Sequence, residues 1–380
     1  MRRVQEVKNR WSTDQLITGI EIQDWVKLLK ENGWQVDPTY FHRAAWITGW
    51  SLPSTILGRL EDAKYGRQLA AMEVEPTPIF ILGHWRSGTT HLHNLLGRDP
   101  NHTYSTVFQA VFPSSFLLGE SFIPKLTSRF MTDTRTYDNV KNGWNEAAED
   151  EIALAKLTGL SPYISFMFPD NAGKYEKYID FIECTDAERQ KWKDGLIYLI
   201  KKIMIATGGK RVVVKSCTHS ARIRLLLEMF PKAKFIHIHR NPYEVFASTL
   251  HMRSHTDWEN FFHLPDEHWE EYHRREQTAL MGERIFSRLL EDRHLIPEEN
   301  YYEISYESLV GRELEVMEEI YTKFELPDWD QYVATISEYL ESIKGYKRNR
   351  LQIDDEFKDF VYDRWRQCFD AYGYPKEYES

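Results

Sequence analysis

The spacing of apolar residues changes near residue 76. Up to about Glu75, apolar side chains recur at helical spacing, first after Ser12 and Thr13, either of which can cap a helix, and again after Pro53. From Thr77 onward, short apolar runs typical of buried strands alternate with helical segments. The expected strands are Ile79–Leu82, Arg211–Val214, Lys234–His239 and Tyr301–Ile304, and the expected helices are Thr89–Leu96, His219–Phe230, Tyr243–Met252 and one from about Asp354 to Tyr372.

Strands that alternate with helices form a parallel sheet with helices on both faces. We therefore expect an α/β fold with a P-loop-like central parallel sheet flanked by helices. The expected division is an N-terminal helical extension packed on the core (1–75), an α/β domain that carries the binding motifs (76–353) and a C-terminal helix (354–380). Ligands of such folds bind at the carboxyl ends of the strands, so motifs that follow strands should gather at one edge.

The first expected strand runs into a loop that is bounded by Gly83 and Gly88 and ends on the hydroxyls of Thr89 and Thr90. Backbone N–H groups in such a loop, backed by the start of a helix, bind a phosphate or sulfate ester. The spacing is that of a Walker A loop, but Thr89 stands where the Walker lysine would be. Because that lysine reaches the β- and γ-phosphates, its absence favours a donor with less charge at its 5′ end. Arg86 supplies a positive charge instead.

Two further strands end on cationic residues. Lys215 lies at the end of one, and His219 follows it at the opening of the next expected helix, so both can face the loop around Arg86. The other strand is followed by Arg240, with Ser248 eight residues later. A kinase would more naturally carry an Asp there to help hold Mg²⁺, whereas Arg240 would attract a second anionic group. An isolated His at a helix start is more often a capping residue, and Arg240 has Glu244 as an alternative local partner.

These motifs resemble those of the sulfotransferases that use 3′-phosphoadenosine 5′-phosphosulfate (PAPS). Residues 86–90 have the Arg/Lys-Ser-Gly-Thr-Thr form of that family's 5′-phosphosulfate loop, and residues 240–248 are similar to its 3′-phosphate motif. Residues 215–219 are similar to the segment with the family's catalytic His, at a longer spacing than in the cytosolic members. Residues 302–309 resemble the family's strand ending in Tyr-Glu, and the whole resemblance extends from about Thr77 to Arg350.

The resemblance implies a sulfuryl transfer from PAPS, with no metal required because cationic side chains can balance the charge of the transferring group. Arg86 and Lys215 would stabilise the leaving phosphate, and His219 would be the candidate base. The implied donor-binding residues are Arg86, Ser87, Gly88, Thr89, Thr90, His91, Arg240, Ser248, Lys347 and Arg348. Among them, His91 stands where the cytosolic enzymes have a Trp that stacks on adenine. Lys347 and Arg348 stand near the place of the family's Arg-Lys-Gly loop, or form a solvated charge run.

The acceptor side has less distinctive signals. A rival base is Glu151, in the acidic run 149–151 that opens a helical segment, although acidic residues there commonly just complement the helix dipole. The segments 108–130 and 163–169 are rich in aromatic and apolar residues, which line an apolar pocket or belong to the core. We expect a small-molecule acceptor with a hydroxyl or amine, preferably an apolar alcohol or phenol, and a carbohydrate stays open.

Charge and composition narrow the partners. The net charge of −10 opposes a nucleic-acid binder that relies on a basic surface. Three widely spaced cysteines suggest free thiols in a reducing compartment, without a metal-binding pattern. The N-terminus lacks a signal-peptide pattern and no apolar run approaches about 18 residues, so we expect a soluble, cytoplasmic protein. A homodimer is left open.

Two other functions compete with sulfuryl transfer. A P-loop kinase or nucleotide hydrolase is disfavoured by Thr89 in place of Lys and by Arg240 in place of Asp. A non-catalytic nucleotide-binding protein is disfavoured by the presence of Arg86, Lys215 and His219 together.

Overall fold

The computed structural model describes residues 15–127, 141, 143–263, 274–345, 353 and 355–377. The chain divides into two compact units, each assembled from three segments. Unit 1 consists of residues 1–74, 105–206 and 251–273, and unit 2 of residues 75–104, 207–250 and 274–380. The two units are described in turn.

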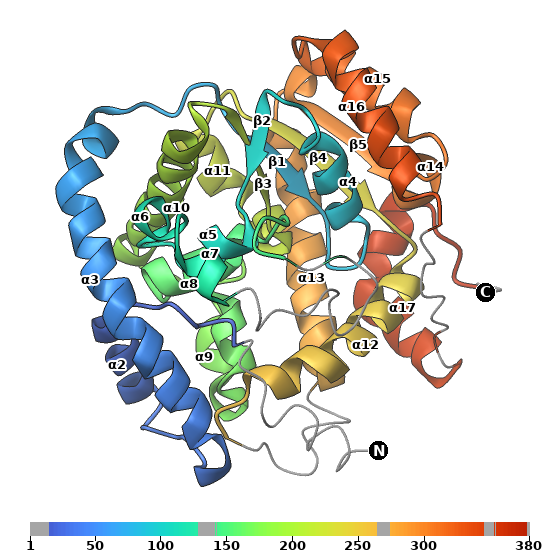
Figure 1. The fold of residues 1–380 in the computed structure, drawn as a ribbon. Coiled ribbons are helices and arrows are strands. Elements are labelled where there is room, and N and C mark those ends of the chain that lie inside the picture. Colours follow the sequence, from blue (N-terminus) through green and yellow to red (C-terminus); the bar gives the residue numbers. More distant parts are fainter. Residues whose placement is uncertain are drawn as a thin grey trace. The chain divides into compact units, whose positions relative to one another are not determined.

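Unit 2 contains a five-stranded sheet in the order β2-β3-β1-β4-β5, in which every pair of neighbours is parallel. The strands are β1 (Ile79–Leu82), β2 (His102–Tyr104), β3 (Arg211–Lys215), β4 (Lys234–His239) and β5 (Tyr301–Ser305). All four expected strands are confirmed, and β3 and β5 are each one residue longer than expected. The sequence prediction missed β2, since three residues with two polar side chains carry no strand period. The expected α/β fold with a central parallel sheet is confirmed (Figure 1).

Alternate residues of the strands face two layers of helices, as the strand period requires. On one face, Ile79, Ile81, Val213, Ile236 and Ile238 form a core with α4 (Thr89–Leu96), α15 (Glu313–Phe324) and α16 (Trp329–Ser342). On the other face, the ring of Phe80 stacks on that of Phe235 and packs against that of Phe230. Figure 1 shows α15 beside α16, and α13 (Arg274–Asp292) beside α17 (Asp355–Tyr372).

The remaining helical elements of unit 2 correct one prediction. They are η5 (Cys217–Ala221), α11 (Ile223–Met229), η7 (Arg293–Leu295), η8 (Glu298–Asn300) and α14 (Tyr306–Leu309), while α12 (Pro242–Asn260) begins in unit 2 and ends in unit 1. The expected single helix over residues 219–230 is wrong at its start, because Arg222 has non-helical dihedral angles and separates the 3₁₀ helix η5 from α11. His219 therefore lies inside η5. The C-terminal helix is confirmed as α17.

The named elements of unit 1 are all helices, and an antiparallel bridge joins Thr106 and Ala147. Its elements are α2 (Ile22–Glu31), η1 (Pro38–Tyr40), α3 (Phe41–Ala71), α5 (Val107–Val111), α6 (Phe116–Gly119), α7 (Ile123–Thr127), α8 (Asp150–Thr158), η3 (Pro162–Phe166), η4 (Pro169–Asn171), α9 (Gly173–Glu176) and α10 (Asp186–Thr207). The helical expectation for the N-terminal residues is confirmed in α2 and α3, whereas residues 16–19 form a turn. Ser12 and Thr13 lie outside the described residues.

A buried ion pair helps to hold unit 1 together. Lys202 of α10 pairs with Glu61 of α3, and both side chains are shielded from solvent. The ammonium group of Lys202 also donates to the carbonyl of Pro113 (2.6 Å), and the carboxylate of Glu61 accepts from the N–H of Leu118 (3.0 Å). The pair thus ties two long helices to the segment around α6. None of the described helices of the chain has both the length and the apolar character needed to span a bilayer.

Candidate functional site

The loop between β1 and α4 has a backbone that requires glycine at two positions. Gly83 and Gly88 have φ angles of 148° and 105°. A Cβ on Gly83 would lie 2.5 Å from the carbonyl oxygen of Ile238, and one on Gly88 would lie 2.5 Å from the ring of Tyr306. Only glycine combines these angles with so little space. The tight turn brings the loop back to the start of α4.

Two hydroxyls hold the loop in place. The Ser220 hydroxyl of η5 accepts the N–H of Gly83 at 2.7 Å, and the Ser87 hydroxyl donates to the carbonyl of His84 at 2.8 Å. Gly88 is the N-cap of α4, and no side chain caps that helix. The backbone N–H groups at the start of α4 are therefore suited to bind an anion.

Tertiary structure brings the two anion motifs of the sequence into direct contact. The Nε of Arg86 donates to the hydroxyl of Ser248 at 2.9 Å, and the Nη1 of Arg240 donates to the carbonyl of Arg86 at 3.4 Å. These pairs are separated by 162 and 154 residues in the sequence. The loop after β1 and the turn after β4 thus form one cationic site at the carboxyl edge of the sheet.

Besides the carbonyl of Arg86, Arg240 contacts two further neighbours in this structure. Its guanidinium pairs with the carboxylate of Glu244, one turn along α12, and lies over the ring of Tyr306 at 4.5 Å from the ring centroid. The alternative local partner expected from the sequence is therefore present. An anionic ligand that binds Arg240 must compete with Glu244.

Lys215 and His219 lie close to the same edge, but both are enclosed by protein. Lys215 is the last residue of β3, paired in register with Ile81, and its residue is 3% exposed. His219 is 0% exposed, and its ring meets that of Phe80 edge-on at 5.8 Å between centroids. Lys215 lies at the strand end as expected, whereas His219 lies inside η5 and beneath the surface, not at the opening of a longer helix.

The remaining predicted donor residues have separate surroundings. His91 lies on α4, and its Nε2 is 3.2 Å from Oε1 of Glu313 at the start of α15. Burial is the largest single influence on the Glu313 carboxyl and raises its pKa, but the hydrogen bonds from His91 and from backbone N–H groups, together with the charge of His91, lower that pKa overall. Lys347 and Arg348 lie outside the described residues.

The rival base Glu151 belongs to unit 1. It lies in the first turn of α8 and is 0% exposed, and the neighbouring Asp150 is also buried. The preceding Glu149 accepts a hydrogen bond from the Tyr163 hydroxyl. In the same unit, Phe108 and Phe112 pack against each other and against Trp144, so this part of the expected acceptor segment is core.

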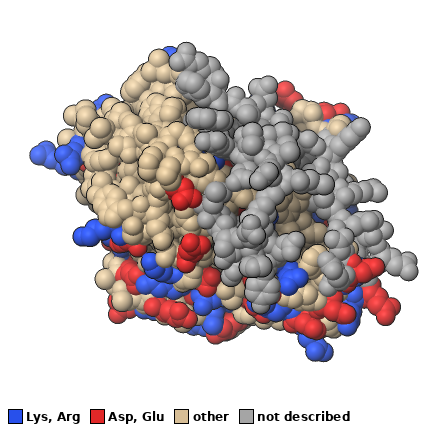
Figure 2. Space-filling model, turned by 90° about the horizontal axis from the view of Figure 1, so that it is seen from below, with Lys and Arg blue, Asp and Glu red and all other residues tan. Residues whose placement is uncertain are grey.

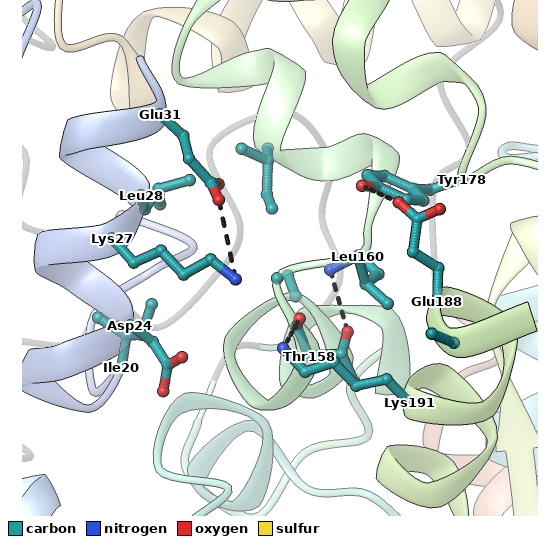
Figure 3. A pocket seen from close by; sticks show the side chains of 14 residues that line it. Ile20, Asp24, Lys27, Leu28, Glu31, Thr158, Leu160, Tyr178, Glu188 and Lys191 are labelled. Atoms are coloured by element: carbon teal, nitrogen blue, oxygen red, sulfur yellow. Dashed lines mark hydrogen bonds and ion pairs between the residues drawn. The ribbon is translucent and has the colours of Figure 1, made fainter. Parts of the chain in front are cut away.

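A pocket of about 290 Å³ lies in unit 1 between α2, the end of α8 and the start of α10 (Figure 3). None of the predicted site residues lines it. Most of its charged groups have protein partners: Lys27 pairs with Glu31 at 3.7 Å, and Lys191 donates to the Thr158 carbonyl at 2.6 Å. The pocket is thus distinct from the anion motifs.

The distribution of surface charge and the placement of metal-ligating side chains bear on the macromolecular partners and metal ions that the protein could bind. On the face shown in Figure 2, Lys and Arg side chains are intermixed with Asp and Glu where charges are dense. Within the described part of the chain, no group of three or more His, Cys, Asp or Glu residues could hold a metal ion.

Two residues that build the site were not predicted from the sequence. Ser220 anchors the loop through Gly83, and Tyr306 lies against both Gly88 and Arg240. Tyr306 falls within the segment 302–309 that resembles the family's Tyr-Glu strand, which was the available signal. Ser220 had none, because a serine beside a histidine is common.

Comparisons with known proteins identify the family. A model described as "Sulfotransferase family" matches residues 78–331. Omega-hydroxy-beta-dihydromenaquinone-9 sulfotransferase Stf3 of Mycobacterium bovis and that of Mycobacterium tuberculosis are each 32% identical over 361 residues, covering 95% of this chain and 92% of the relative.

Solved structures share the fold. Sulfotransferase STF9 from Mycobacterium avium has a TM-score of 0.65 at 18% identity, covering 93% of this chain and 96% of its own. STF1 from Mycobacterium tuberculosis has a TM-score of 0.61 at 17% identity, covering 90% and 91%. The family match and the identity to Stf3 select sulfuryl transfer over the kinase and the non-catalytic alternatives, and the chain belongs to the sulfotransferase family.

Proposed function

We propose that this sulfotransferase moves a sulfuryl group from PAPS to a hydroxyl of an apolar small molecule. The observation that carries the proposal is a contact between two segments: the loop between β1 and α4 (the Arg86 loop) and the turn between β4 and α12 (the Arg240 turn). This contact suits a nucleotide with phosphates at both its 5′ and 3′ positions. The acceptor oxygen attacks sulfur, the bond from sulfur to the 5′-phosphate oxygen breaks, and adenosine 3′,5′-bisphosphate leaves. The acceptor proton passes to a base.

In this proposal the cationic site balances the charge that forms on the leaving oxygen. The N–H groups of the loop at the start of α4, together with Arg86 and Lys215, surround the 5′-phosphosulfate. Arg240 and Ser248 take the 3′-phosphate through charge-assisted and neutral hydrogen bonds. The hydrogen bond between Arg86 and Ser248 supports this division, because it keeps the two subsites side by side.

His219 is our candidate base, with Glu151 as its rival. A positioned base contributes about 10²–10⁴-fold to the rate. We expect His219→Ala to lower turnover more than donor affinity, whereas a wild-type rate would remove His219 from catalysis. Glu151→Ala should act on the acceptor side, and an effect confined to donor affinity would count against its role.

We propose that the acceptor is a hydroxylated apolar molecule of the quinone type. Support comes from the related Stf3 proteins, whose names give an omega-hydroxy dihydromenaquinone as their substrate. A screen with labelled sulfate donor would compare hydroxylated isoprenoid quinones, simple phenols and carbohydrates. Labelling of carbohydrates alone would refute the apolar acceptor without affecting the donor assignment.

Calorimetry on the wild-type protein tests the donor. We expect adenosine 3′,5′-bisphosphate to bind without added metal and to bind more tightly than ATP with Mg²⁺. Binding of ATP with Mg²⁺ alone, accompanied by its turnover, would overturn the proposal.

A further inference from the structure

Residues 372–376, which are the last residue of α17 and the four that follow it, contact the chain on both sides of the Arg240 turn. Before the turn, the ring of His239 stacks on that of Tyr372, with centroids 4.1 Å apart and planes at 13°, and its Nδ1 lies 2.9 Å from the Tyr374 hydroxyl. After the turn, the hydroxyl of Tyr243 donates to the carbonyl of Lys376 at 2.8 Å. Residues 372–376 therefore bracket the turn between β4 and α12, all within unit 2.

Glu307 connects this C-terminal segment to the backbone of the turn. Its Oε2 accepts from the hydroxyl of Tyr374 at 3.1 Å, and its Oε1 accepts the N–H of Asn241 at 3.2 Å. Because the tyrosine hydroxyl has one proton and donates it to Glu307, it accepts from His239, which assigns the proton of the neutral ring to Nδ1. Burial lowers the pKa of His239 to about 4, so this form persists at neutral pH.

We infer that residues 372–376 position the Arg240 turn for the 3′-phosphate of the donor, with Tyr374 and Glu307 as positioning residues. The inference rests on the proposed function, which assigns Arg240 to that phosphate. The physical reason is preorganisation: a turn whose backbone is fixed before binding loses less conformational freedom when the ligand arrives. The side chain of Arg240 is steadied separately, by Glu244 and Tyr306.

The test compares two nucleotides that differ only in the 3′-phosphate. Tyr374→Phe keeps the ring and removes the hydroxyl with its hydrogen bonds to His239 and Glu307. The Kd of adenosine 3′,5′-bisphosphate should rise by about fivefold to tenfold, a change on the scale of the net strength of one ordinary hydrogen bond. The Kd of 5′-AMP should stay at the wild-type value. In this variant the KM for the donor should rise while kcat at saturating donor is unchanged, since the inference places neither Tyr374 nor Glu307 in contact with the transferring group.

Two further variants keep the inference falsifiable. Tyr243→Phe removes the hydrogen bond to the carbonyl of Lys376 on the other side of the turn. It should likewise raise the Kd of adenosine 3′,5′-bisphosphate relative to the Kd of 5′-AMP. Tyr302→Phe is the matched control, because it removes a hydroxyl on β5 that bonds to Glu319 and not to the C-terminal segment. Thermal melting of each variant verifies that it is folded.

The possible results distinguish a failure of the positioning role from a failure of the proposed function. If the wild-type protein does not bind the bisphosphate, the proposed function and this inference both fall. If the wild-type protein binds it and Tyr374→Phe either matches the wild type or weakens both nucleotides equally, the function stands and the positioning role is overturned.

Discussion

Removal of the Arg240 side chain is the sharpest test of the two-phosphate site. The guanidinium already pairs with Glu244, so a bound 3′-phosphate exchanges one anionic partner for another. A charge-assisted hydrogen bond contributes about 1.5–3 kcal/mol. The competing pair is partly exposed, with side chains 19% and 27% accessible, and such pairs contribute about 0–1 kcal/mol. The net loss in Arg240→Ala is then about 0.5–3 kcal/mol, a factor of roughly 2 to 150 in Kd.

Calorimetry with adenosine 3′,5′-bisphosphate and 5′-AMP measures this loss. We expect Arg240→Ala to weaken the bisphosphate by that factor and to leave 5′-AMP nearly unchanged. Arg240→Lys is the matched control, since it keeps the charge but loses the planar fork of donors. Its Kd for the bisphosphate should lie between those of the wild type and Arg240→Ala. Equal losses for both nucleotides would refute the assignment of Arg240 to the 3′-phosphate.

Three further predictions concern the loop, pH and the core. Gly88→Ala should raise the Kd of the bisphosphate at least about tenfold, because the φ of 105° is strained for alanine and its methyl group would meet the ring of Tyr306; wild-type affinity would show that the loop tolerates the change. Burial lowers the pKa of His84 from 6.5 to about 4. The unfolded chain therefore takes up a proton at this position below about pH 6.5 while the folded chain does not, and stability falls by at most roughly 3 kcal/mol as pH drops from 6.5 to 4. Urea unfolding across this range should show a shallower decline in His84→Gln, and identical slopes would contradict the reasoning. Lys202→Met should reduce the free energy of unfolding by about 3–5 kcal/mol, because it leaves Glu61 charged and buried without its partner. The double variant with Glu61→Leu should recover most of that loss in the same urea assay, and no recovery would mean that the ion pair is not the cause.

Much of the fold could be predicted because most strands of the parallel sheet are visible as short apolar runs in the sequence. The strands β1, β3 and β4 are buried on both faces over most of their length, so each stands out in the sequence, whereas β5 is an edge strand in which only Ile304 is buried. The strand β2 could not be found in this way, and the non-helical angles at Arg222, which end η5 before α11, depend on packing and not on periodicity. The interior position of His219 was also hidden, since η5 packs against β1, where the ring of Phe80 meets that of His219, and against α13, both distant in sequence.

The predicted chemical character of the site comes from local features of the sequence, which are a glycine-bounded loop without the Walker lysine and, after β4, an arginine followed by a serine eight residues later. Each of these features lies within ten residues, so a short continuous stretch of sequence contains all of it. The hydrogen bond of Arg86 to Ser248, the contact of Arg240 with the carbonyl of Arg86, and the packing of residues 372–376 around the turn between β4 and α12 arise from the fold of the whole unit. Those contacts join residues more than a hundred positions apart, so they depend on the order of the strands in the sheet, which no short stretch of sequence contains.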